Sequence, residues 1–303
     1  MQQVVITGIN GFVGKHLTRE LKSAGCNVIG LDRSETVHEE ITDLVDDYRA
    51  ADLAAEWPEL PKVDAIIHLA GLAAVAPSFD NPQAYININS AIVTNMCEYY
   101  LKQEKKPRIL IISSGTVYDP SLPMPLHEED GLAYTSPYVV SKALLEAQAH
   151  YYNIRGIECA IMRPFNHVGP GQMPGFLVPD LAERIRARES MSDPIEVGNL
   201  DTKRDYTDVR DVVKAYLLVA TKEGKLDHPI YNVCSGVSHS GHEVLNAIVN
   251  AMSIEKPETV VNEKFLRPND IMDIRGDNSH LVNEFGWELT YSFEQTIADF
   301  VNG

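Results

Sequence analysis

A short apolar run followed by three evenly spaced glycines most restricts how this chain can fold. Residues 4–6 are apolar and predict a buried strand, and Gly8, Gly11 and Gly14 follow before an apolar pattern of helical spacing. Glycines in such a turn let the backbone bend tightly and let the helix pack closely on the strand. The N-terminus of that helix then offers backbone N–H groups that suit a phosphate. The pattern therefore predicts a parallel α/β unit that binds a dinucleotide.

The second predicted strand supports this prediction. Residues 27–31 are mostly apolar and lead into Asp32, close to the spacing at which a carboxylate binds the ribose of an adenosine. This carboxylate favours NAD because it repels a 2′-phosphate, whereas Arg33 beside it could accept that phosphate. The choice between NAD(H) and NADP(H) stays open.

In the remainder of the chain, the pattern of predicted elements changes near residue 165. Apolar runs at 63–71 and 108–112 predict further buried strands, and strand and helix patterns alternate up to about residue 165, as in a doubly wound α/β fold. Beyond a turn-rich junction at 163–172 the predicted elements are shorter, and 230–236 reads as one more sheet strand. We therefore predict a parallel Rossmann sheet with a smaller interleaved α/β substrate-binding lobe. The predicted ranges are 1–165 with a return segment at about 205–236 for the dinucleotide-binding domain, and 166–204 with 237–303 for the lobe.

Three polar side chains near the ends of these elements suggest acid/base chemistry. Pro137 suits the first turn of a helix, which places Tyr138 and Lys142 one turn apart on one face. An ammonium fixed beside a phenol favours the phenolate and lowers the phenol pKa, which makes a general acid/base group. Taken alone, this spacing more often means a half-buried aromatic and a surface charge, and a serine after a strand is often a cap. Because Ser114 follows a predicted strand at its carboxyl end, we expect the three groups to converge.

Charge argues against polyanionic partners. The chain has 26 basic and 43 acidic residues, for a formal charge of −17. A protein this acidic is not expected to bind nucleic acid or an anionic membrane surface. No apolar run reaches the about 20 residues that span a bilayer, and the N-terminal residues do not resemble a signal sequence. We therefore expect a soluble cytoplasmic protein.

The cysteines and one histidine are predicted to be structural. Cys26, Cys97, Cys159 and Cys234 are scattered in apolar surroundings without paired or metal-ligand spacing, so we predict buried free thiols and no metal site. His68, inside a predicted strand, is typical of a core histidine.

The glycine turn, Asp32, Ser114, Tyr138 and Lys142 occur in an order that resembles the extended short-chain dehydrogenases/reductases, over essentially the whole chain. Within that family, four runs are most similar to the reductases that act on the C4 ketone of a GDP-linked 4-keto-6-deoxyhexose. These runs are residues 11–17, 112–115, 163–172 and 231–236, of which 163–172 is the most specific.

The resemblance implies roles for individual residues. Ser114 would hydrogen-bond the substrate carbonyl, Tyr138 would transfer the proton, and Lys142 would lower the pKa of Tyr138 and hold the nicotinamide ribose. Residues implied to bind NADP(H) or NAD(H) are Gly8, Asn10, Gly11, Phe12, Val13, Gly14, Asp32, Arg33, Asp52, Leu53, Leu69, Ala70, Gly71, Asn89, Tyr138, Lys142 and Pro164. Residues implied to bind a GDP-linked nucleotide sugar are Ser114, Gly115, Thr116, Tyr138, Asn166, Val197, Arg204 and Arg267.

Some of these positions have plainer explanations. Asp52 could cap a surface turn, Asn89 could simply pack in the core, and Arg204 and Arg267 could be solvated surface charges. Apolar residues at helical spacing predict a helix that begins at Asn89 and continues through Tyr100. The resemblance also implies a homodimer through the helices that carry Asn89 and Tyr138. One departure from the family is Asp119-Pro120 after Tyr118, where relatives usually have Gly, which leaves the shape of that loop open.

The implied reaction is reduction of GDP-4-keto-6-deoxy-D-mannose to GDP-D-rhamnose or to its C4 epimer GDP-6-deoxy-D-talose. A sugar-nucleotide 4-epimerase with retained NAD is the alternative, and a non-catalytic dinucleotide-binding subunit ranks lower because it needs no proton donor. A 4,6-dehydratase also ranks low, because Thr116 stands where related dehydratases have an acidic residue. The product configuration at C4, the nucleotide base and the choice between dimer and tetramer stay open.

Overall fold

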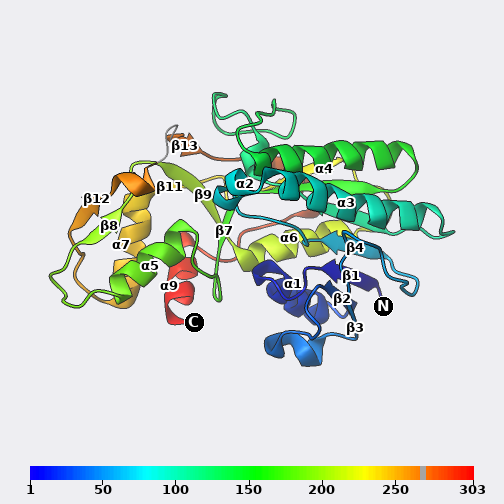
Figure 1. Ribbon diagram of the computed structural model, residues 1–303, viewed down its shortest axis with the longest axis horizontal. Helices are drawn as coiled ribbons and strands as arrows, with labels where there is room; N and C mark the ends of the chain where they lie inside the picture. The colour runs from blue at the N-terminus through cyan, green and yellow to red at the C-terminus, as the bar shows by residue number, and fades with distance from the viewer. Residues whose placement is uncertain (267–270) are drawn as a thin grey trace.

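The computed structural model of the chain describes residues 1–266 and 271–303 (Figure 1). A large sheet with its helices occupies one end of the long axis, and two small sheets with α5, α7 and α9 occupy the other. The predicted substrate contact Arg267 lies outside the described residues. Among the described helices, none is both long and apolar enough to cross a membrane.

Seven parallel strands of the described chain form the large sheet. They are β1 (Gln3–Thr7), β2 (Asn27–Asp32), β3 (Asp47–Ala50), β4 (Ala65–His68), β5 (Arg108–Ile112), β6 (Cys159–Pro164) and β10 (Ile230–Val233). Their order is β10-β6-β5-β4-β1-β2-β3, with every neighbouring pair parallel. This confirms the doubly wound Rossmann sheet, including the late strand predicted at 230–236.

Helices cover both faces of the large sheet. Neighbouring residues of a strand point to opposite faces, so Val5 and Ile6 belong to different apolar clusters. The cluster around Ile6 includes residues of α1, α6 and α8, and the cluster around Val5 includes residues of α3 and α4. The helices on this part of the chain are α1 (Phe12–Ser23), α2 (Ala76–Asp80), α3 (Pro82–Leu101), α4 (Pro137–Ile154), α6 (Val209–Thr221) and α8 (Ser279–Phe285).

One predicted helix boundary was wrong. The apolar spacing indicated a helix beginning at Asn89, whereas α3 begins at Pro82, with this proline in its first turn. Proline suits that position because its missing N–H would have no partner there. Asn89 consequently lies inside the helix and is buried.

The smaller lobe has its own apolar core. One small sheet has the order β11-β9-β13 with β7 paired to β9, and β12 pairs with β8. Its elements are β7 (Asn166–Val168), α5 (Leu177–Arg186), β8 (Ile195–Val197), β9 (Lys203–Asp208), β11 (Ser238–Ser240), α7 (Gly241–Met252), β12 (Thr259–Val261), β13 (Asp273–Ile274) and α9 (Phe293–Asn302). The junction predicted at 163–172 is therefore more regular than expected, because it contains the end of β6 and all of β7. The predicted domain ranges stay a prediction, and Leu281 and Trp287 pack in the core of the large sheet.

The carboxyl ends of the central strands meet at one edge of the large sheet. Thr7 pairs with His68, and His68 pairs with Ile111 on β5. Gly8, directly after β1, has a φ of +71°, and a Cβ there would lie 3.0 Å from the backbone nitrogen of Ala70. The glycine turn and the loop after β4 are therefore in contact at this edge.

The four cysteines Cys26, Cys97, Cys159 and Cys234 are buried and free, as predicted.

Candidate active site

The glycine turn forms a cradle that fits a dinucleotide phosphate. Gly11 is the N-cap of α1 and supplies no side-chain hydrogen bond to the first turn. A Cβ on Gly14 would lie 2.5 Å from the carbonyl oxygens of Gly8 and Ile9, so a larger residue would force the turn apart. An uncapped helix N-terminus with exposed backbone above it is the arrangement that accepts a diphosphate.

Asp32 lies at the end of β2, directly beside this cradle. Its carboxylate accepts hydrogen bonds from the backbone nitrogens of Asn10 at 3.2 Å and Ser34 at 3.1 Å. The Asn10 side chain reaches further, accepting from the His38 nitrogen at 2.8 Å and donating to the Thr36 carbonyl at 3.0 Å. The loop after β2 is thereby fixed against the glycine turn. Arg33 is exposed on that loop.

Two predicted cofactor contacts have structural roles in their own loops. Asn89, 1% exposed, accepts from the Leu72 nitrogen at 2.8 Å and donates to the Leu72 carbonyl and to Ser141 Oγ, both at 3.1 Å. These bonds fasten the loop after β4 to α3 and α4, which favours the packing explanation for Asn89. Asp52 is exposed and accepts from the Ala54 nitrogen at 3.1 Å, the geometry of a surface turn cap.

The other predicted cofactor residues lie along the same edge with differing exposure. Phe12 and Val13 are half-buried in the first turn of α1, and Leu69 and Ala70 are half-buried after β4. Gly71, which follows them, is exposed, with a φ of +144°. Leu53 is buried in the core, and Pro164 is buried at the end of β6.

Ser114, Tyr138 and Lys142 meet at the end of β5. Ser136 caps α4 by accepting from the Val139 nitrogen at 3.2 Å, which fixes where the helix begins. Lys142 Nζ donates to the Ile112 carbonyl at 2.7 Å and lies 5.8 Å from the centre of the Tyr138 ring. Tyr138 is 7% exposed and Lys142 is 9% exposed. A hydrogen-bond effect of the Ser114 hydroxyl lowers the pKa of the Tyr138 phenol.

Ser114 also serves as a cap. Its Oγ accepts from the Thr116 nitrogen at 3.2 Å at the start of the 3₁₀ helix Gly115–Val117, and it lies 2.9 Å from Thr116 Oγ1. The capping role and the role beside Tyr138 are compatible, because a hydroxyl oxygen accepts two bonds and donates one.

The electrostatics correct one sequence-based prediction. We expected Lys142 to lower the pKa of Tyr138, whereas burial raises the pKa of this phenol above its ordinary value, with the bond from Ser114 opposing the rise. Burial lowers the pKa of Lys142 to about 8, with the charge of Glu146 opposing the fall. Sequence spacing placed the two groups on one face but carried no information on how deeply α4 buries them. Tyr138 therefore keeps its proton at neutral pH.

His68 is neutral, as a core histidine would be. Burial, followed by the charge of Lys142, lowers the pKa of His68 to about 3. Its Nδ1 lies 2.8 Å from Thr7 Oγ1 in the layer beneath α4.

A buried ion pair that the sequence did not reveal joins α4 to β6. The guanidinium of Arg163 donates to the carboxylate of Glu146 at 2.9 and 2.7 Å, and the two side chains are 3% and 4% exposed. Ser113 Oγ donates to the same carboxylate at 2.5 Å. The network connects β5, β6 and α4 one turn beyond Lys142. A pairing between positions 17 residues apart has no local spacing signal, so only the fold reveals it.

The predicted substrate-binding residues differ in their exposure to solvent. Asn166 and Thr116 are exposed, while a Cβ on Gly115 would lie 2.8 Å from the Phe165 ring. Val197 is buried in the core of the smaller lobe, and its carbonyl accepts from the Asn262 nitrogen at 2.9 Å. Arg204 donates to the Ile271 carbonyl at 2.8 Å.

Known proteins match this chain along nearly its whole length. A family model described as the NAD dependent epimerase/dehydratase family matches residues 4–234. The GDP-6-deoxy-D-mannose reductase of Pseudomonas aeruginosa is 33% identical over 301 residues, which cover 98% of this chain and 95% of that protein. The GDP-6-deoxy-D-talose 4-dehydrogenase of Aggregatibacter actinomycetemcomitans is 27% identical and covers 98% and 96%, respectively.

A solved structure also matches this chain along nearly its whole length. The UDP-glucose 4-epimerase from Bifidobacterium longum in complex with NAD⁺ and UDP has a TM-score of 0.86 to this chain and is 26% identical. The match covers 99% of this chain and 97% of that one.

Proposed function

Because the chain belongs to the NAD dependent epimerase/dehydratase family of extended short-chain dehydrogenases/reductases and is an NAD(P)-dependent oxidoreductase, we propose that it reduces the C4 ketone of a nucleotide-linked 4-keto-6-deoxyhexose. The substrate we favour is GDP-4-keto-6-deoxy-D-mannose, and the product is GDP-D-rhamnose or GDP-6-deoxy-D-talose. The observation that carries the proposal is the buried Tyr138 phenol beside Ser114, whose raised pKa keeps its proton available for donation. The named activity of the Pseudomonas aeruginosa relative supports the choice of sugar.

In this proposal each side chain has one task. Ser114 Oγ donates a hydrogen bond to the C4 carbonyl oxygen and orients it toward Tyr138. Bound NADH or NADPH supplies the hydride that forms the new C4–H bond. Tyr138 donates its proton to the oxygen, so that C=O becomes CH–OH. The Lys142 ammonium, held by the Ile112 carbonyl, would offset part of the larger cost that burial imposes on the phenolate, until solvent returns the proton.

The cofactor and substrate contacts complete the proposal. Gly8, Gly11, Gly14 and Asp32 would hold the diphosphate and the adenosine ribose. Asn166 would contact the sugar nucleotide. The chain around Val197, together with Arg204 and Arg267, would surround the base and the diphosphate of that nucleotide.

We also propose a cytoplasmic homodimer. Its interface would be the paired helices α3 and α4, where Tyr151 is half-exposed and Ile154 is 88% exposed. A solution mass equal to one chain would contradict the dimer.

Cofactor stoichiometry separates reduction from 4-epimerisation, which the resemblance to UDP-glucose 4-epimerases makes the second candidate. A reductase releases an oxidised cofactor after each turnover, whereas an epimerase regenerates its own. We expect GDP-4-keto-6-deoxymannose to consume one NADH or NADPH per product, measured by nicotinamide absorbance and product chromatography. Epimer formation from a 4-hydroxy sugar nucleotide with no net cofactor oxidation would refute the reductase and support the epimerase.

Asp32→Ala tests the ribose contact. Loss of a hydrogen bond to a charged group costs about 1.5–3 kcal/mol, so the Kd for NADH should rise about 10-fold to 100-fold. The Kd for NADPH should change less, because the substitution also removes repulsion toward a 2′-phosphate. Asp43→Ala, at an exposed position of the 3₁₀ helix Glu39–Leu44, is the matched control and should leave both constants unchanged. If Asp32→Ala weakened the binding of NADH and NADPH equally, this carboxylate would not contact the adenosine ribose.

The pH profile tests Lys142. Because its pKa is lowered to about 8, the ammonium is charged below pH 8 and loses its charge as the pH rises through that value. We expect kcat/KM to fall above about pH 8, since this ratio reports groups of the free enzyme. Circular dichroism at each pH controls for unfolding. A profile that stays flat well beyond pH 9 would show that the charge of Lys142 is not required.

A further inference from the structure

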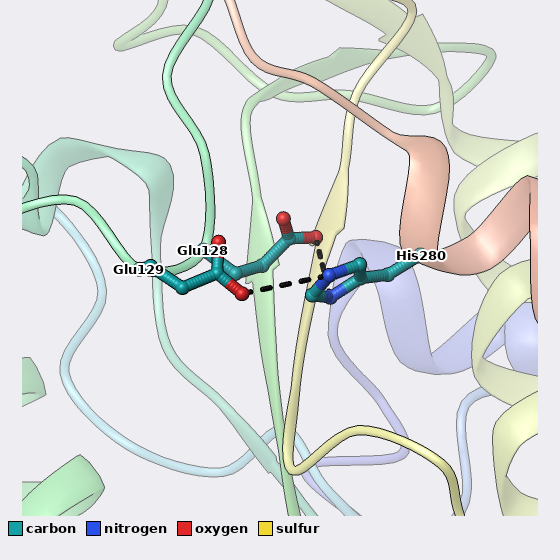
Figure 2. A group of neighbouring side chains, drawn as sticks. All are labelled: Glu128, Glu129 and His280. Carbon is teal, nitrogen blue, oxygen red and sulfur yellow. Dashed lines mark ion pairs between the residues drawn. The ribbon is translucent and has the colours of Figure 1, made fainter.

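Two carboxylates and an imidazole converge away from the proposed active site. Glu128 and Glu129 belong to the loop before α4, and His280 lies in the first turn of α8 (Figure 2). One ligand atom from each of the three side chains lies within 4.8 Å of the other two. The residues are about 150 positions apart in sequence, so no ligand spacing indicates the cluster, and the sequence analysis predicted no metal.

The imidazole of His280 is oriented as metal-binding histidines usually are. Its Nδ1 lies 3.3 Å from the Ile230 carbonyl, a contact that favours the tautomer with the proton on Nδ1. In that tautomer Nε2 carries a lone pair, and it lies 3.6 Å from Glu129 Oε1. The ring of His228 stacks on His280 with centres 3.6 Å apart and planes 10° from parallel, which restricts rotation of the imidazole.

Glu128 is a fixed carboxylate rather than a mobile surface one. The residue is 5% exposed, and its Oε1 accepts from the Asn232 nitrogen at 2.7 Å. In the part of the chain that the structure describes, the only cation within ion-pair distance of this carboxylate is His280, whose Nδ1 lies 3.6 Å from Oε1 and whose ring is charged only when protonated. A buried carboxylate that is held by one amide and lacks a permanent positive partner gains from a bound cation.

We propose that Glu128, Glu129 and His280 bind one Zn²⁺, with water as the fourth ligand. A nitrogen and two carboxylate oxygens suit Zn²⁺ better than Ca²⁺ or Mg²⁺, which prefer oxygen ligands alone. Tetrahedral Zn²⁺ with bonds of about 2.0–2.1 Å separates its ligand atoms by about 3.4 Å. The ligand atoms lie within 4.8 Å of one another and therefore need to close by up to about 1.4 Å. Glu129 Oε1 is already 3.6 Å from Nε2, and its exposed side chain is free to move with the ion.

The ion would join three separate segments. It would tie the loop before α4 to α8, beside the start of β10. The carbonyl of Glu128 accepts from Arg163 Nη1 at 3.0 Å, which connects this loop to the buried ion pair beneath the active-site helix. Zn²⁺ would thus stabilise the segment that leads from Ser114 to Tyr138 without taking part in the reaction.

Direct binding tests this proposal on the full chain, purified without a histidine tag and dialysed against a chelator. Zn²⁺ is titrated by calorimetry and by competition with a chromophoric chelator, and thermal unfolding is followed with and without Zn²⁺. We expect one saturable equivalent and a raised Tm in the wild type. His280→Gln should weaken binding at least ~10-fold, since loss of an outer partner alone costs about 10–100-fold. Glu129→Gln, at an exposed position, should weaken it without a folding defect.

The matched control is His242→Gln, which removes an exposed histidine whose Nε2 lies 3.2 Å from Asp201. Binding should survive this change. X-ray absorption of the Zn²⁺-loaded wild type should show one nitrogen and three oxygen ligands, which requires no variant. No saturable binding in the wild type, or equal affinity in the wild type and His280→Gln, would overturn the proposal and leave His280 as an ion-pair partner of the two carboxylates.

Discussion

Tyr138→Phe is expected to lower turnover at least ~10²-fold, the usual contribution of a general acid. The substitution removes only the hydroxyl, and the ring keeps its contacts with Val117 and Val139. The fold and cofactor binding should therefore persist. Turnover is measured with the 4-keto substrate, and cofactor binding by nicotinamide fluorescence.

The matched control for this variant is Tyr134→Phe, in the loop before α4, where the tyrosine is mostly exposed. It should retain wild-type turnover. A Tyr138→Phe enzyme with near-normal turnover would remove Tyr138 from the mechanism, and loss of cofactor binding in this variant would assign it a structural role instead.

The fold was predictable because its signals are local. Each central strand is a short apolar run, and the glycine turn and Asp32 lie in sequence next to the strands whose ends they occupy. Ser136 and Pro137 likewise mark the start of α4 by their own chemistry. Such features need no knowledge of distant residues, so the doubly wound parallel sheet could be predicted from the sequence. The positions of Ser114, Tyr138 and Lys142 near the ends of its elements could be predicted in the same way.

The properties that the sequence did not reveal depend on contacts between distant segments. The direction of the Tyr138 pKa shift depends on burial, which the spacing from Tyr138 to Lys142 does not encode. Asn89 was predicted to meet the cofactor, yet its polar atoms contact Leu72 and Ser141, which only the packing of α3 on α4 brings near. The sequence of α4 around Glu146 does not distinguish this buried residue from a surface carboxylate.

Glu146 should be the carboxylate whose loss most affects stability. Removing one partner of a buried ion pair leaves the other charge uncompensated and typically costs about 3–5 kcal/mol. Glu146→Gln should therefore lower the free energy of unfolding by about that amount, measured by urea denaturation. Arg155→Gln breaks a pair with Glu98 whose side chains are both 40% exposed, and a change of about 0–1 kcal/mol is expected there.

The same variant should also change the pH profile. The charge of Glu146 raises the pKa of Lys142 against the larger effect of burial, so its removal should lower that pKa further below about 8. The alkaline fall of kcat/KM should then begin at a lower pH in Glu146→Gln and keep its wild-type position in Arg155→Gln. A large loss of stability with an unchanged profile would mean that Glu146 supports α4 only through Arg163, and that its charge does not reach Lys142.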